Sequence, residues 1–70
     1  MNYDIEMCWD DTVGVWCAMC DNIPLALESH SFDALIARVK IAATEILALN
    51  GEKNEDVRLC FRATHWECIA

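Results

Sequence analysis

Residues 22–51 read NIPLALESHSFDALIARVKIAATEILALNG, and this stretch decides the fold. Its apolar side chains recur in steps of three and four, which predicts one amphipathic helix over 32–49. Ser31 is a good N-cap, and Asn50-Gly51 is a strong stop. The expected apolar stripe is Phe32, Leu35, Ile36, Val39, Ala42, Ala43, Ile46 and Leu47. A helix with a single apolar stripe must cover a sheet or another helix.

The rest of the chain predicts four short strands for this helix to cover. The first and the last strand alternate between apolar and polar side chains, as half-buried strands do. The second is apolar on both faces, which is typical of a central strand. The third follows Pro24, which cannot donate to a sheet ladder, and is expected at an edge. The predicted strands are 3–9, 15–20, 25–29 and 57–64.

The order of these elements limits the topology. The first three strands form an antiparallel meander, and a right-handed helical crossover then brings the last strand beside the first. The sequence therefore predicts an α+β fold of two layers, a four-stranded mixed sheet in the order 3-2-1-4 with one helix on one face. We expect one domain over residues 1–70, a charged loop at 52–55 and a tail or short extension at 65–70.

The two faces of the predicted sheet differ in chemistry. The expected helix-facing set is Tyr3, Ile5, Met7, Val15, Cys17, Met19, Val57, Leu59 and Phe61. On the opposite face, Trp16 is expected among small and sulfur-containing side chains rimmed by charges, which is typical of a protein interface. Two alternatives stay open: Trp16 packs locally, or the two faces are exchanged. The candidate interface is Cys8, Trp16, Ala18, Cys20, Arg58, Cys60 and Arg62.

Charge and composition exclude several classes of function. The net charge is −7, so direct nucleic-acid binding is not expected, whereas a basic protein partner is compatible with it. No apolar run reaches the ~18 residues of a membrane span, and the N-terminus lacks a signal-peptide pattern, so we expect a cytoplasmic protein without a membrane partner. A domain this small buries only about 60% of its unfolded surface, so a homodimer or higher oligomer is expected.

Cysteine and histidine spacing suggests metal or catalytic chemistry that the predicted fold does not favour. The Cys17-x-x-Cys20 pair with His65-x-x-Cys68 resembles a zinc ligand set. Residues three apart on a strand point to opposite faces, so the first pair is not expected to share a metal. No pattern positions His30 or His65 beside a cysteine for catalysis. We therefore expect no catalytic residue, no metal and no cofactor, and a protein that is not an enzyme.

Several short runs follow one another in a recognisable order: an acidic turn, Gly-x-Trp-x-Ala, Asp-x-Ile-Pro, a capped helix and a Leu-Asn helix end. They are Trp9-Asp10-Asp11, residues 14–18, residues 21–24, residues 27–29 with 31–35, and residues 45–51. In this order they resemble the HicB-like antitoxin domains, above all their small stand-alone bacterial branch, which is catalogued as a domain of unknown function.

The resemblance implies a truncated ribonuclease-H-like fold and a non-enzymatic role in protein–protein interaction. HicB-type members of toxin–antitoxin systems neutralise HicA-type toxins, which are small, basic ribonucleases that cut messenger RNA. Larger members also carry a C-terminal DNA-binding domain, which we do not expect within these residues. The implied function is an antitoxin-like binder of a small basic toxin. The alternative is a stand-alone homo-oligomeric domain without a toxin, acting as a regulatory or small-molecule binder.

Overall fold

The structure, a computed structural model, describes residues 1–51 and 57–69. Its elements are β1 (Asn2–Asp10), β2 (Val15–Cys20), β3 (Leu25–Ser29), α1 (Phe32–Leu49) and β4 (Arg58–Thr64). The predicted helix and all four predicted strands are confirmed, with end differences of one residue at β1 and β4. The loop predicted at 52–55 lies outside the described residues. Within the described residues, no helix has the length and hydropathy that a membrane crossing needs.

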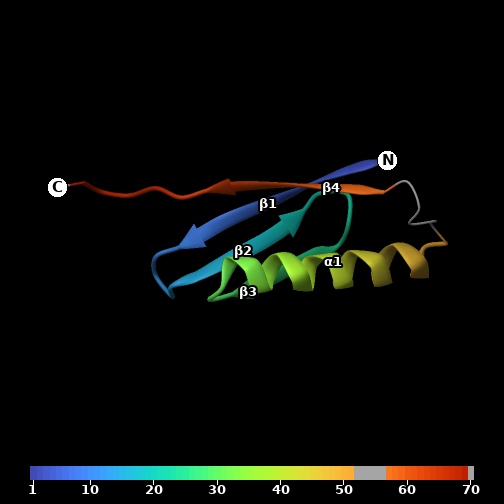
Figure 1. Cartoon of the computed structure of the whole chain (residues 1–70), viewed down its shortest axis with the longest axis horizontal. Coiled ribbons are helices and arrows are strands. Elements are labelled where there is room, and N and C mark those ends of the chain that lie inside the picture. The colour runs from blue at the N-terminus through green and yellow to red at the C-terminus, as the bar shows by residue number, and fades with distance from the viewer. Residues whose placement is uncertain (52–56, 70) are drawn as a thin grey trace.

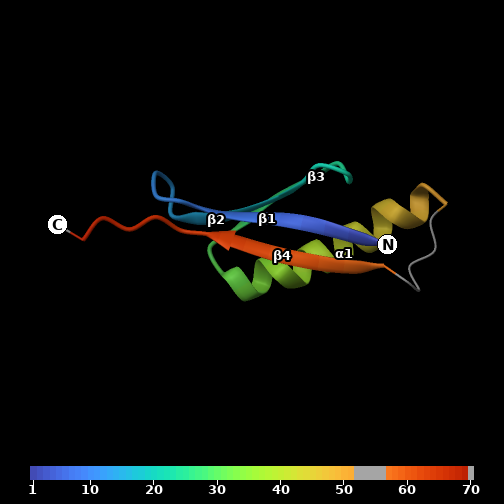
Figure 2. The same ribbon diagram turned by 90° about the horizontal axis from the view of Figure 1, so that it is seen from above.

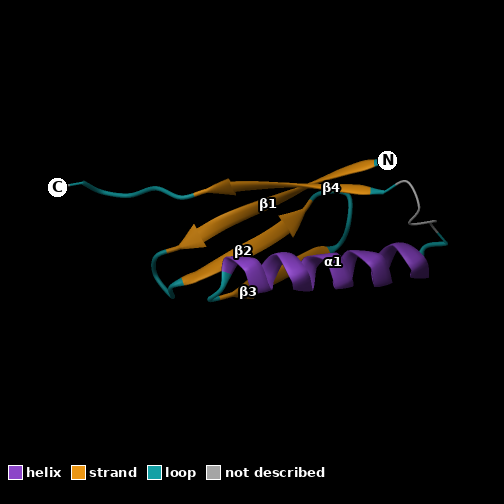
Figure 3. Ribbon diagram, viewed as in Figure 1, coloured by secondary structure: helices purple, strands orange, loops and turns teal. Residues whose placement is uncertain are grey.

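The four strands form one sheet in the order β3-β2-β1-β4, as predicted. The pairs β1–β2 and β2–β3 are antiparallel, and β4 runs parallel to β1. The helix lies on one side of this sheet and packs most closely against β3 and β2 (Figures 1 and 2). Figure 3 shows the two layers, with α1 on one side and the strands on the other. The α+β fold expected from the sequence is therefore confirmed.

Local signals in the sequence place the ends of α1. The Ser31 Oγ accepts a hydrogen bond from the Ala34 backbone N–H at 3.2 Å, which satisfies one of the free donors of the first turn. Beyond the helix, Gly51 has a φ of 78°, a conformation that favours glycine. All eight residues of the predicted stripe are buried or packed against the core. The stripe alone therefore identified the covered face of the helix.

The core lies between α1 and the sheet. Ile5 and Met7 of β1 and Leu35 and Val39 of α1 have no exposed surface. Ile23, in the turn before β3, is only 1% exposed and adds a core side chain from outside the strands and the helix stripe. Full burial of such side chains contributes about 1.5–3 kcal/mol each, so these few residues dominate the stability of a small domain.

One prediction about the sheet is wrong: the two faces of β2 are exchanged. Met7 lies directly opposite Ala18, and Trp9 opposite Trp16, and such opposed residues share a face of an antiparallel sheet. The side chains of Trp16, Ala18 and Cys20 therefore face α1. The three β2 residues expected there pair with Asp10, Cys8 and Glu6 and lie on the opposite face: Val15, Cys17 and Met19. Because both faces of β2 are apolar, alternation within the strand could not decide between them.

Candidate functional site

The predicted interface is split between the two faces of the sheet. Cys8, Arg58, Cys60 and Arg62 are exposed on the face opposite α1, as expected. Trp16, Ala18 and Cys20 face the helix, where Ala18 is fully buried. The seven residues therefore do not form one surface, and the open alternative of exchanged faces holds for β2 but not for β1 or β4.

A different set of residues occupies the uncovered side of the sheet. In the strand register, Glu6 pairs with Met19 and Met19 with Ala26, while Cys8 pairs with Cys17 and Cys17 with Glu28. These two rows cross three strands and form a continuous patch on the side away from α1. Met19 is 56% exposed, so the patch has an apolar centre open to solvent. We call this patch the open sheet face: Glu6, Cys8, Cys17, Met19, Ala26 and Glu28.

The charges on this side of the sheet are unevenly distributed. The Arg62 Nε lies 3.6 Å from the Asp4 Oδ1, and both side chains are exposed. These two residues and Arg58 belong to β1 and the β4 edge, whereas β2 and β3 contain no lysine or arginine. The open sheet face thus combines an apolar centre with the carboxylates of Glu6, which lies opposite Arg62 of β4, and Glu28. Surfaces of this kind suit a partner that is basic at its rim.

Cys17 lies within this patch, between Cys8 and Glu28. Burial raises the pKa of its thiol, and the nearby charges of Glu28, Asp10 and Cys8 raise it further. Because the thiolate is the reactive form of cysteine, these neighbours keep Cys17 protonated and a weak nucleophile. The arrangement favours an apolar contact at this position over reactive thiol chemistry.

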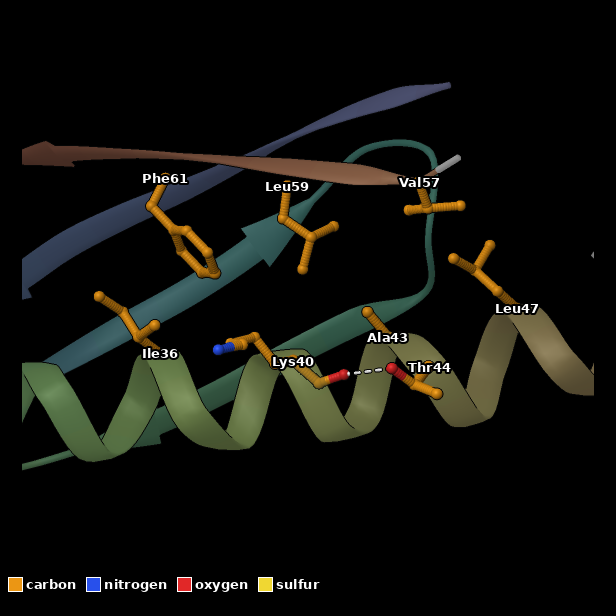
Figure 4. Close-up of a pocket in the computed structure, with 8 residues that line it drawn as sticks. All are labelled: Ile36, Lys40, Ala43, Thr44, Leu47, Val57, Leu59 and Phe61. Carbon is orange, nitrogen blue, oxygen red and sulfur yellow. Dashed lines mark hydrogen bonds between the residues drawn. The ribbon is translucent and has the colours of Figure 1, made fainter. Parts of the chain in front are cut away.

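A second surface feature lies on the helix side of the sheet. An apolar groove of about 370 Å³ separates α1 from β4 (Figure 4). Figure 4 shows Leu59 and Phe61 of β4 pointing toward α1, whereas the Lys40 side chain extends along the helix. The groove exists because α1 lies over β3 and β2 rather than over β4. Its lining residues are Ile36, Lys40, Ala43, Thr44, Leu47, Val57, Leu59 and Phe61.

An aromatic cluster lies where β4 ends and α1 begins. Its members are Trp9, Trp16, Phe32 and His65. The Trp16 ring centroid is 5.5 Å from that of Trp9 and 5.7 Å from that of His65. The His65 Nε2 is also 2.8 Å from the Glu67 Oε1. From the sequence, His65 was expected in a tail or short extension. The aromatic cluster instead holds the start of that tail against the helix side of the sheet.

The paired motifs considered for zinc do not converge. Cys17 pairs with Glu28 on the open side of the sheet, whereas Cys20 pairs with Leu25 on the helix side. The expectation that these two cysteines point to opposite faces is confirmed. Among residues 1–51 and 57–69, no three His, Cys, Asp or Glu side chains are grouped so that they hold a metal ion. His30 lies elsewhere, with its Nδ1 3.1 Å from the Gly14 carbonyl oxygen.

Comparison with known proteins identifies relatives of this fold and sequence. The family model described as a domain of unknown function (DUF1902) matches residues 2–69. The chain is also similar to the crystal structure of a hypothetical protein, TTHA1013, from the extremely thermophilic bacterium Thermus thermophilus. The two share 31% sequence identity and a TM-score of 0.81, over 99% of this chain and 100% of that one. No curated protein matches. The chain belongs to the DUF1902 family of domains of unknown function.

Proposed function

We propose that this chain is a non-enzymatic protein-interaction domain, and specifically an antitoxin-like binder of a small basic toxin of the HicA type. The observation that carries the proposal is the open sheet face. It exposes Met19 between two carboxylates, Glu6 and Glu28, on strands that lack basic residues. Apolar patches with a polar rim are typical of binding surfaces.

Electrostatics favours a basic partner over other partners. The net charge of −7 attracts cationic proteins over long distances and raises their rate of association. The resemblance to HicB-like domains points in the same direction, because the toxins of that family are small and basic. Contacts between rim charges speed association and set specificity, while Met19 and its neighbours supply the apolar burial.

Affinity purification tests this function. The tagged chain is expressed in its source bacterium, and the proteins that it retains are identified by mass spectrometry. The proposal expects a small basic protein that high salt releases and that arrests growth when it is expressed without this chain. If the retained proteins include none with these properties, the antitoxin function is rejected in favour of the stand-alone domain without a toxin.

A further inference from the structure

We propose that two copies of this chain form a two-fold dimer in which each C-terminal arm, residues 65–69, lies along β4 of the other copy. In this dimer the arm of one copy closes the α1–β4 groove of its partner. The proposal goes beyond the function argued above. It uses the groove and the edge of β4 rather than the open sheet face, so each can be rejected without the other.

The first observation is the arm itself. Trp66 is 85% exposed and Ile69 is fully exposed, although both side chains are large and apolar. The arm continues past the end of β4 and away from the rest of the molecule in both views (Figures 1 and 2). The molecule is accordingly 49 Å long but only 18 Å across. An extended apolar segment of this kind gains stability when another surface covers it.

The second observation is that the arm cannot reach beyond Phe61 into the groove of its own chain. His65 is held against Trp9 and Trp16, so only residues 66–69 are left to turn back. Four extended residues reach at most ~14 Å. Leu59, in the groove, lies six positions before His65 on an extended chain, or about 20 Å away. The part of the groove at Val57 and Leu59 is therefore open to the arm of a second copy and out of reach of the chain's own arm.

The third observation is the match between arm and strand. The outer edge of β4 is an edge of the sheet, since β4 is last in the strand order. Antiparallel pairing of β4 with its copy, centred on Ala63, places residues 65–69 beside residues 57–61 of the partner. This register puts a small side chain on the two-fold axis. It also places Arg62 opposite the partner's Thr64 rather than opposite the partner's Arg62, which avoids directly opposed like charges.

Alternation along the arm then sorts its side chains between the two faces. His65 lies on the helix side, so Glu67 and Ile69 share that side and Trp66 takes the other. On the helix side, Ile69 meets the apolar groove at the partner's Val57, and Glu67 lies on the side where Lys40 lines the groove. On the other side, Trp66 lies between the partner's Arg58 and Arg62, and arginine is favourable beside a tryptophan ring.

The size of the contact is compatible with a stable dimer. Specific interfaces bury about 1,200–2,000 Å² in total. Two tryptophan side chains supply at most about 300–500 Å² of this, and the two grooves, the two Ile69 side chains and the strand pairing add to it. Each chain carries −7, so repulsion between copies opposes the dimer, and salt that screens it should strengthen the association.

Sedimentation equilibrium of the full chain, up to millimolar concentration, tests the arm exchange. The wild type should be dimeric, and the chain truncated after His65 and the variant Ile69→Asp should both be monomeric. Leu49→Ser is the matched control, because Leu49 is 86% exposed but belongs to neither the arm nor the groove. Circular dichroism checks that each variant is folded. A monomeric wild type, or a dimer that survives truncation, overturns the proposal.

A charge exchange tests which side chains meet. Lys40→Glu and Glu67→Lys should each weaken the dimer about 2- to 30-fold, since each change affects two symmetric ion pairs. An equimolar mixture should recover wild-type affinity as a heterodimer, because each arm then meets an opposite charge in the other groove. This recovery separates the intermolecular contact from the loss of the Glu67–His65 pair within one chain. If the dimer in the mixture is no more stable than the homodimers of the two separate variants, the arm-in-groove arrangement is wrong.

Discussion

Trp16 packs edge-on against Phe32, with ring centroids 4.8 Å apart and an interplanar angle of 77°. This contact joins the second strand to the first turn of the helix, and Trp9 extends the cluster onto β1. Edge-to-face aromatic pairs add about 0.5–1.5 kcal/mol beyond the area that they bury. The pair therefore fixes where α1 crosses the sheet, and it places Trp16 in the packing between the layers.

Replacing Trp16 should thus reduce stability. Trp16→Ala removes a half-buried ring from the aromatic cluster, and we expect a loss of about 2–3 kcal/mol, somewhat below the range for fully buried rings. Trp66→Ala is the matched control, because Trp66 is 85% exposed, and its effect should stay within about 0.5 kcal/mol. Urea unfolding at low chain concentration measures both. Equal effects of the two substitutions would contradict the assignment of Trp16 to the helix side.

The N-cap of α1 should contribute measurably to folding. Ser31→Ala loses the hydrogen bond from Ala34 N–H and should cost about 1 kcal/mol, whereas Ser31→Gly should cost only a few tenths. Thr44→Ala is the control within the same helix. Its hydroxyl donates to the Lys40 carbonyl oxygen at 2.7 Å, a bond that caps nothing, so its loss should change little. If Thr44→Ala and Ser31→Ala reduce the free energy of unfolding equally, Ser31 does not stabilise the helix as an N-cap.

The turn between β1 and β2 depends on a left-handed backbone. Gly14 has a φ of 68°, and its N–H donates to the Asp10 carbonyl oxygen at 2.8 Å. A Cβ added at Gly14 meets no heavy atom within 4 Å, so the cost of Gly14→Ala is conformational, about 1–2 kcal/mol. Gly14→Asn should cost less, because asparagine tolerates this conformation better. Thermal unfolding measures both variants. Equal melting temperatures for Gly14→Ala and Gly14→Asn would argue against a left-handed backbone at this position.

The environment of Cys17 predicts a pH dependence of alkylation. Its thiol has a raised pKa, so the reactive thiolate forms at a higher pH than in an unstructured peptide. Iodoacetamide labelling, followed by peptide mass spectrometry, should show a Cys17 rate that still rises where the peptide rate has reached its plateau. In the variant Glu28→Gln the rise should begin at lower pH, because one of the neighbouring charges is gone. If the alkylation rate of Cys17 has the same pH dependence as that of the peptide, the thiol pKa of Cys17 is not raised.

The sequence predicted those parts of the fold that have strong local signals. The helix has a regular stripe, an N-cap at Ser31 and a stop at Gly51, and all three agree with the structure. The strand order followed from short connections and the handedness of one crossover. These signals are local or topological, so none of them depends on how individual side chains pack.

The faces of β2 were mispredicted because they depend on pairing between strands. The four residues of the turn, 11–14, set Asp10 opposite Val15, and this register places Trp16 on the same side as Trp9. A register count from that loop would have corrected the candidate interface. The sequence contains no comparable signal for the groove, because the groove depends on how far α1 lies from β4. The apolar stripe of the helix does not determine that distance.

The most direct test of the proposed binding surface compares two charge reversals in the affinity purification. The double variant Glu6→Lys/Glu28→Lys inverts the charge of the open sheet face, and Glu45→Lys changes one exposed charge on α1. The account predicts that the wild type and the helix variant retain the small basic protein and that the double variant loses it. Retention by the double variant, or equal loss from the helix variant, would contradict binding through the open sheet face.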